Sequence, residues 1–146
     1  AEWHLIGHLQ TNKVRLAAGR FALVQSLDSI RLAEALAARG RQPVLLEVNV
    51  AREPAKHGFT PEEAVSAART VAGMLEVRGL MGMGPLEGDP SEAFAELAGL
   101  RRRLEQALGT RMPILSMGMS HDLEAAVAAG STMLRLGRAL FGERVS

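Results

Sequence analysis

Short apolar segments alternate with amphipathic segments along the chain, and this alternation restricts the folds that it can adopt. Residues 3–9 are typical of a strand, and residues 12–18 of a helix that Gly19 closes. Further strands are expected at residues 21–26, 43–50, 77–83, 114–119 and 132–136. Further helices are expected after Asp28, after Thr60, at residues 91–108 and 122–129, and after Gly137. Such alternation is typical of parallel strands joined by right-handed helical crossovers.

Helix-start signals support several of these elements. Asp28 is an expected N-cap for a helix that ends at Gly40. The Thr60 hydroxyl can accept a free backbone N–H, and Glu63 completes a capping box with it. Residues 91–108 carry apolar side chains at helical spacing, namely Phe94, Leu97, Leu100 and Leu104.

Two architectures fit this pattern, an open doubly wound sheet and a closed (β/α)8 TIM barrel. A doubly wound sheet usually carries its glycine-rich ligand turn after the first strand, whereas the glycine-bearing turns here come late, at Gly118 and Gly137. Late phosphate loops are typical of barrels, which need roughly 250 residues. The chain has 146 residues and six predicted units. We therefore expect an α/β chain, residues 1–146, forming one TIM-barrel domain that lacks its first two β/α units.

Composition excludes several classes of protein. The formal net charge is +1, which argues against a surface built to coat nucleic acid. The chain contains no cysteine, so disulfides and thiolate chemistry are excluded. No apolar run approaches the roughly 20 residues that a membrane-spanning helix needs. A cytoplasmic protein without nucleic-acid or membrane partners is expected.

The two late turns are candidate phosphate-binding loops. Each runs from a strand through a glycine into a helix, where unpaired backbone amides stabilise an anion. Ser120 offers a hydroxyl on one loop, and the amides of Gly137 and Arg138 offer donors on the other. Each feature alone also has a structural explanation, because Ser120 can cap the next helix and Gly137 can relieve a tight turn. Their presence on adjacent late units favours a phosphate site.

Arg135 is a charged residue within an apolar strand pattern. A buried charge is costly unless it is paired, so Arg135 is expected to contact either a ligand or an internal carboxylate such as that of Glu47. The residue types leave both alternatives open.

The remaining histidines and lysines are expected to be structural or solvated. His4 and His8 share one face of the first strand without a third ligand at metal-like spacing, so no metal site is predicted. His57 and His121 are expected in exposed loops. The two lysines, Lys13 and Lys56, are expected to be solvated.

Six short motifs together resemble the pyridoxal-phosphate homeostasis family, which is similar in fold to the barrel domain of bacterial alanine racemase. They are residues 7–13 (GHLQTNK), 47–49 (EVN), 56–59 (KHGF), 79–83 (GLMGM), 115–120 (LSMGMS) and 135–142 (RLGRALFG). The resemblance spans the chain. It implies a barrel that binds pyridoxal 5′-phosphate (PLP) and buffers or delivers it, without an established catalytic activity.

The resemblance also implies roles for particular residues. Ser120 would bind the phosphate, Gly137 and Arg138 would supply donors from the last loop, and Arg135 would face the pyridine nitrogen. Relatives commonly carry a small hydroxyl residue where Arg138 stands. The family's Schiff-base lysine would lie on the first barrel strand, upstream of Ala1, so residues 1–146 are expected to hold the cofactor only non-covalently.

Three further expectations concern activity and partners. A PLP- or phosphate-dependent enzyme of the racemase or isomerase type is the alternative, with His8 and Glu47 as its inward-facing acid–base candidates. PLP-dependent apoenzymes are expected partners of a homeostasis protein. The strand edges at residues 3–9 and 132–136 are expected to be unpaired and to promote self-association.

Overall fold

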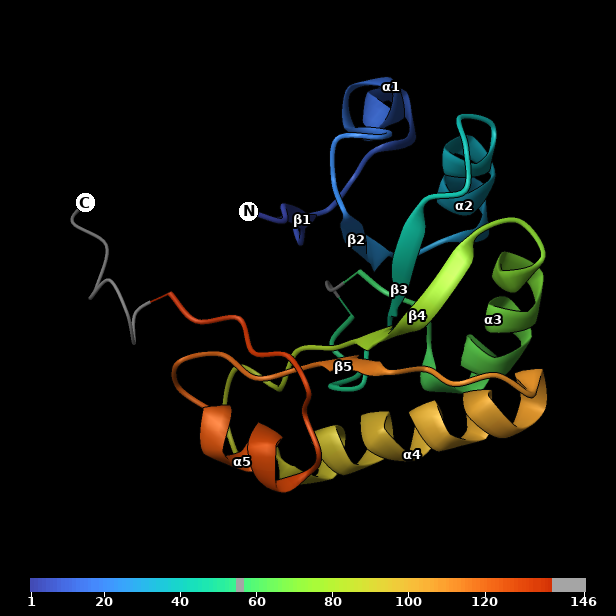
Figure 1. The fold of residues 1–146 in the computed structure, drawn as a ribbon. Coiled ribbons are helices and arrows are strands. Elements are labelled where there is room, and N and C mark those ends of the chain that lie inside the picture. The colour runs from blue at the N-terminus through green and yellow to red at the C-terminus, as the bar shows by residue number, and fades with distance from the viewer. Residues whose placement is uncertain (55–56, 138–146) are drawn as a thin grey trace.

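The computed structural model describes residues 1–54 and 57–137. Its sheet contains β1 (His4–Leu5), β2 (Leu23–Leu27), β3 (Pro43–Glu47), β4 (Glu76–Met81) and β5 (Ile114–Ser116). The intervening helices are η1 (Thr11–Lys13), α1 (Val14–Ala17), α2 (Ile30–Ala37), η2 (Pro61–Glu63), α3 (Ala64–Ala72) and α4 (Ser91–Leu108), with α5 (Leu123–Ala128) after β5. Figure 1 shows these elements.

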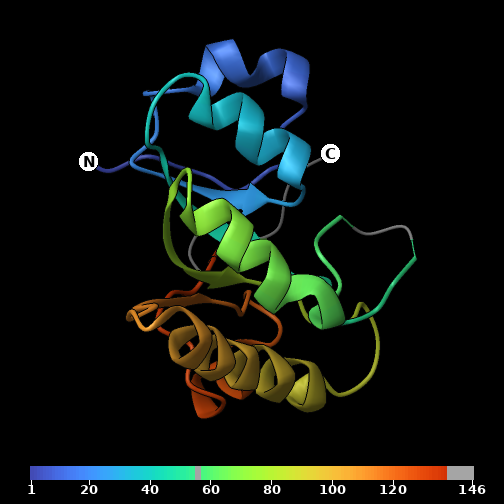
Figure 2. The same ribbon diagram turned by 90° about the vertical axis from the view of Figure 1, so that its right-hand side faces the viewer.

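The strands are parallel and pair in chain order, from β1 to β5. Helices α1 to α4 follow one another down a single side of the sheet, as the side view in Figure 2 shows. A doubly wound sheet would reverse its strand order at a switch point and carry helices on both faces, so that alternative is wrong for the described strands. The fold is α/β, with a curved parallel sheet that forms half of a barrel.

The core has two parts, one on each face of the sheet. The outer core lies between sheet and helices and includes Val44, Leu46, Leu97 and Leu104, all of them buried. The inner core contains Leu23, Leu45 and Met81 from three adjacent strands, with Met83 and Ile114 packed against it. Burial on both faces explains the near-continuous apolar run at the start of β3.

None of the helices in the two described ranges is long and apolar enough to cross a membrane. The longest, α4, carries charged residues along its outer surface.

The predicted sixth strand, residues 132–136, is only partly formed. Its segment lies beside β5, where Met117 N donates to the Met133 carbonyl at 3.1 Å, but the pairing is a single bridge between Ser116 and Met133. The Thr132 hydroxyl accepts a hydrogen bond from Leu115 N at 2.8 Å, so a side chain occupies a donor that a strand backbone would use. This competition between side chain and backbone limits the number of backbone hydrogen bonds between residues 132–136 and β5.

The other strands are shorter than predicted. Residues 3–9 form a strand only over His4–Leu5, at the edge of the sheet. Residues 43–50 form one over Pro43–Glu47, because Asn49 N donates to the Phe59 carbonyl at 2.8 Å rather than to a neighbouring strand. Local bonds of this kind end the sheet near the carboxyl ends of its strands.

The helix predictions were more accurate. The capping box at Thr60 is confirmed, with Glu63 N to Thr60 Oγ1 at 3.2 Å and Thr60 N to Glu63 Oε1 at 3.0 Å. The limits of α4 are those predicted. Asp28 as an N-cap was wrong, because Ser29 accepts the hydrogen bond from Leu32 N at 3.1 Å. The helix predicted after Gly137 lies outside the described residues.

We predict that Gly79→Ala lowers the free energy of unfolding by roughly 2–4 kcal/mol. Gly79 lies where the pairing of β3 with β4 shifts register, and a Cβ there would overlap the backbone carbonyl of Ile114 in β5. Urea unfolding followed by far-ultraviolet circular dichroism measures the change, since the single tryptophan, Trp3, is 70% exposed and reports poorly on the core.

Gly99→Ala is the matched control. A Cβ at Gly99, inside α4, would meet only Arg102 Nη2 at 3.8 Å, so this variant should gain about 0.5–1 kcal/mol from helix propensity. A Gly79→Ala protein as stable as the wild type would contradict the close packing of β4 against β5.

Candidate functional site

A tight turn at residues 119–122, between β5 and α5, is closed by hydrogen bonds between its first and last residues. Met119 N donates to Asp122 Oδ1 at 2.7 Å, and Asp122 N donates to the Met119 carbonyl at 3.3 Å. The Asp122 side chain is 7% exposed. This reciprocal pair fixes the turn and leaves half-buried Ser120 at its tip. Asp122, and not Ser120, occupies the N-cap position of α5, although its side chain makes no capping hydrogen bond to the helix.

The two glycines of the late turns have different roles. Gly118 has a φ of 104°, and a Cβ there would lie 2.6 Å from Ala126 Cβ and 2.8 Å from Leu134 Cδ2. It is therefore required for the turn and for packing against α5 and the segment after it. At Gly137 a Cβ would meet nothing within 4 Å, so this position opens onto free space in the described structure.

Arg135 is half-buried and hydrogen-bonded to the protein. Nη1 donates to Ser116 Oγ at 2.8 Å, and Nη2 donates to the Gly82 carbonyl at 2.9 Å. Burial lowers the pKa of the guanidinium from its ordinary value, while the nearby carboxylates of Asp122 and Glu47 act in the opposite direction. The described hydrogen bonds of Arg135 go to Ser116 and Gly82 and leave both alternatives, a ligand or an internal carboxylate, open; arginine remains charged at neutral pH.

A network of hydrogen-bonded side chains extends from Arg135 across the inner face of the sheet. Ser116 Oγ donates to Gln25 Oε1 at 2.6 Å, and both residues are at least 98% buried. Gln25 Nε2 lies 3.0 Å from His4 Nδ1 and 3.2 Å from the Met133 sulfur. This network thus joins β1, β2 and β5. Sequence reasoning missed Gln25 and Ser116; polar residues inside otherwise apolar strands were the available signal.

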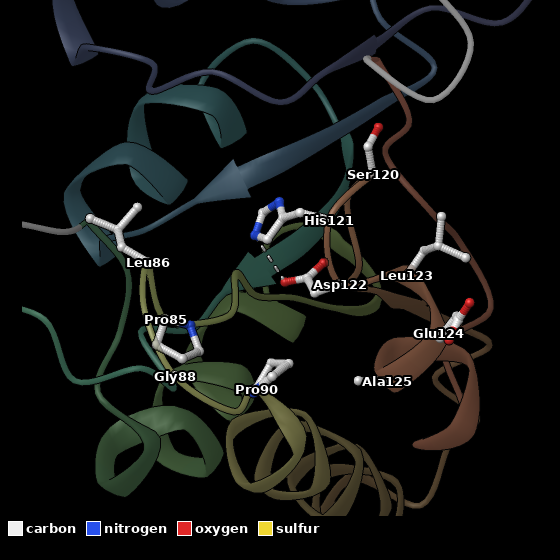
Figure 3. Close-up of a pocket in the computed structure, with 10 residues that line it drawn as sticks. All are labelled: Pro85, Leu86, Gly88, Pro90, Ser120, His121, Asp122, Leu123, Glu124 and Ala125. Atoms are coloured by element: carbon white, nitrogen blue, oxygen red, sulfur yellow. Dashed lines mark ion pairs between the residues drawn. The ribbon is translucent and has the colours of Figure 1, made fainter. Parts of the chain in front are cut away.

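A pocket of about 490 Å³ opens between the loop that follows β4 and the turn that follows β5 (Figure 3). One wall contains Pro85, Leu86 and Pro90, and the other runs from Ser120 to Ala125. His121 Nε2 lies 3.5 Å from Asp122 Oδ2 inside it. In Figure 3 the Ser120 hydroxyl points away from the opposite wall. The described lining does not include Arg135 or Gly137.

The predicted site residues are therefore distributed as follows. Ser120 is on the rim of the pocket, Arg135 is on the inner face of the half-barrel, and Gly137 is exposed beyond it. Arg138 and Lys56 lie outside the described residues, and Lys13 is exposed on η1. The joint role of these residues in phosphate binding stays a prediction.

The histidines differ from one another in their contacts. His4 contacts Gln25 in the interior, which agrees with a structural role. His8 Nδ1 lies 2.9 Å from Asp28 Oδ2 and its ring stacks on that of His57, so the two histidines predicted to share a strand face have separate partners.

Comparison with known proteins gives the family. Residues 1–145 match the family described as alanine racemase, N-terminal domain. The chain belongs to this family. Its relatives include the pyridoxal phosphate homeostasis protein of Aquifex aeolicus, 40% identical over 153 residues, and that of Haemophilus influenzae, 38% identical over 154. Each alignment covers 98% of this chain, and 67% and 65% of the respective relative. The chain thus spans about two thirds of their length, and the resemblance predicted from its motifs is confirmed.

Solved structures of the family agree with the fold. The PipY protein of Synechococcus elongatus without PLP has a TM-score of 0.87, and with PLP bound 0.85. Both are 36% identical, and the matches cover 97% of this chain and 71% and 70% of theirs. Alanine racemase of Clostridium difficile has a TM-score of 0.72 at 15% identity, covering 99% of this chain and 40% of that one, which supports the fold alone.

We predict that Ser116→Ala lowers the free energy of unfolding by about 1–3 kcal/mol, because Arg135 Nη1 and Gln25 Oε1 both lose a buried partner. Urea unfolding measures the change.

Ser26→Ala is the matched control, since it removes the same atom from another fully buried serine. The Ser26 hydroxyl has no hydrogen-bond partner within residues 1–54 and 57–137. Its removal should leave stability unchanged or raise it by up to about 1 kcal/mol. Equal losses in both variants would show that the network from Gln25 to Arg135 contributes nothing specific.

Proposed function

We propose that this protein binds pyridoxal 5′-phosphate and takes part in homeostasis of that cofactor. One observation carries the proposal: the chain matches PipY, solved with PLP bound, at 36% identity over 97% of its length. Relatives at about 40% identity carry the name pyridoxal phosphate homeostasis protein. PLP-dependent apoenzymes are the partners that we propose for such a protein, and the role implies a cytoplasmic location.

The donor set of the late turns suits a phosphomonoester. Ser120 offers a hydroxyl on a turn that Asp122 holds in place, and Gly137 offers an amide at a position without a side chain in its way. Arg138 offers a second amide and a positive charge. Hydrogen bonds from such donors to a charged acceptor are stronger than bonds between neutral groups. The residues present therefore fit the phosphate group of PLP.

Arg135 suits the other end of the cofactor. A guanidinium carries five N–H donors, and the bonds to Ser116 and Gly82 use two of them in the described structure. These bonds fix the group, so that a remaining donor can meet the pyridine nitrogen. PLP would supply an electron-withdrawing ring and an aldehyde. A permanent cation keeps the pyridine nitrogen unprotonated and weakens that withdrawal.

We further propose that residues 1–146 hold PLP without a covalent bond and belong to a single (β/α)8 barrel domain. Lys13, the one lysine within the described residues, is exposed on η1. The greater length of the relatives supports a barrel with further units than the five strands seen here.

The racemase-type alternative has less support. Its two acid–base candidates have different partners. His8 lies 2.9 Å from Asp28, and the carboxylate of Glu47 raises the pKa of the Arg135 guanidinium. The likeness to alanine racemases lies at 15–21% identity, which carries no inference about activity.

We predict that Ser120→Ala weakens PLP binding by roughly 10–100-fold, the value of a hydrogen bond to a charged group. Isothermal titration of PLP into residues 1–146 measures the affinity, and gel filtration of the complex should release the cofactor if no covalent bond forms. Ser66→Ala, on the exposed face of α3, is the matched control and should bind as the wild type does.

Pyridoxal without its phosphate separates the phosphate site from binding elsewhere. It should bind far more weakly than PLP to the wild type and equally weakly to Ser120→Ala. Wild-type affinity for PLP in both Ser120→Ala and Arg135→Ala would rule out the proposed site.

We also propose that the β1 edge pairs with another strand. β1 has one neighbour in the described sheet, and Trp3 and Ile6 beside it are 70% and 46% exposed. Unpaired edges with exposed apolar side chains are sites of strand addition.

Residues 1–146 alone are therefore predicted to self-associate in light scattering, with an average mass that rises with concentration. Trp3→Lys with Ile6→Lys should lower that mass, because charge blocks edge pairing. Leu86→Lys is the control, since Leu86 is 75% exposed in the loop after β4. A wild-type protein that stays monomeric at every concentration would contradict strand pairing at the β1 edge.

A further inference from the structure

Three side chains that could bind a metal ion meet at the carboxyl ends of three adjacent strands. His8 follows β1, Asp28 directly follows β2, and His57 lies in the connection after β3. One ligand atom of each lies within 4.8 Å of the others. Parallel pairing in chain order brings these positions together although they are far apart in sequence.

The two imidazoles converge on one carboxylate oxygen. His8 Nδ1 is 2.9 Å from Asp28 Oδ2, and His57 Nδ1 is 3.8 Å from the same atom. The rings stack with their centroids 3.8 Å apart and their planes 5° from parallel. His8 lies within hydrogen-bond distance of that oxygen, whereas His57 at 3.8 Å does not, so a hydrogen bond does not account for the position of the second ring. Because the lone pair of an imidazole nitrogen lies in the ring plane, one ring must turn out of this stack before both nitrogens can reach a single ion.

Local structure fixes the backbone at Asp28 and next to His57. Asp28 lies between β2 and Ser29, the N-cap of α2. Phe59 N donates to the Glu47 carbonyl at 2.8 Å, which ties the chain next to His57 back to β3. Gly58 has a φ of 120°, and a Cβ there would lie 2.9 Å from Asn49 N, so only glycine allows this close return.

Exposure suits a site that is anchored at its base and open to solvent. The Asp28 side chain is 9% exposed, whereas those of His8 and His57 are 38% and 56% exposed. An ion can therefore reach the imidazoles from outside and find the carboxylate behind them.

We propose that His8, Asp28 and His57 bind a late first-row divalent metal ion, with Zn²⁺ as the preferred occupant. Two nitrogen ligands and one oxygen ligand favour such ions over Mg²⁺ and Ca²⁺, which prefer oxygen. Zinc bonds of about 2.0–2.2 Å place tetrahedral ligand atoms about 3.3–3.5 Å apart, and 2.9 and 3.8 Å lie on either side of that value. Water would complete the fourth position. The inference does not depend on PLP binding.

The test is isothermal titration of ZnCl₂ into residues 1–146, purified without a polyhistidine tag and free of PLP. One Zn²⁺ per chain should bind, and MgCl₂ should give no heat. CoCl₂ should produce the visible absorption bands of Co²⁺ bound to nitrogen and oxygen ligands. Zn²⁺ should also raise the midpoint of thermal unfolding, because an ion that binds only the folded chain stabilises it.

His8→Gln and His57→Gln each remove one ligand at an exposed position, so the chain should still fold. Each should weaken Zn²⁺ binding by more than the roughly 10–100-fold that loss of an outer partner costs. His121→Gln is the matched control: His121 is 49% exposed and lies 3.5 Å from the carboxylate of Asp122, but it belongs to no group of three candidate ligands among the described residues. It should bind Zn²⁺ as the wild type does.

Two results would overturn the site. One is no Zn²⁺ binding by the wild type, and the other is wild-type affinity in the double variant His8→Gln/His57→Gln. Loss of PLP binding would not affect this test, so its failure and that of the proposed function are distinguishable.

Discussion

Parallel pairing of the strands in chain order is the constraint on which this structure depends. It places every strand's carboxyl end at the same edge of the sheet, so residues as far apart in sequence as His8 and Ser120 follow strands that end together. The inner face changes character toward that edge. Leu23 and Leu45 lie deep in the sheet, and Gln25 and Glu47 come two residues later on the same strands. The polar groups of the inner face thus lie toward the edge at which barrels bind their ligands.

The bonds that fix Arg135 decide what the candidate cofactor site can do. Ser116 and Gly82 hold the guanidinium, and Gln25 in turn holds Ser116. A charged donor that is already oriented loses little conformational freedom when a ligand arrives, which favours tight and specific holding. The same rigidity and permanent charge are unsuited to proton transfer, for which a group must change its protonation state. The hydrogen bonds around Arg135 thus suit the holding of a ligand group.

The sequence predicted elements whose signals are local, and missed those that depend on contacts between strands. The capping box at Thr60 and the limits of α4 follow from residues within a few positions of one another. Asp28 was misassigned because its type suits an N-cap, whereas the fold brings His8 to it across a strand pair. Gln25 likewise looks like an interruption of an apolar strand until Ser116 is known to lie opposite. Placing Ser120 near the pocket needed only the strand–turn–helix order, but its relation to Arg135 depends on packing that no local pattern encodes.

The carboxyl ends of the strands meet at one edge of the sheet, and different interactions organise this edge near β5 and near β1 to β3. Around β5, hydrogen bonds that involve Asp122, Ser116 and Arg135 fix the turn and the segment beside it. Around β1 to β3, the connections converge on the single carboxylate of Asp28, and one of the two imidazoles beside it lies too far for a hydrogen bond. A metal ion would contact all three groups and tie three connections together, which the hydrogen bond from His8 cannot do. The proposed ion would therefore stabilise the ends of β1 to β3 by joining connections that share one carboxylate.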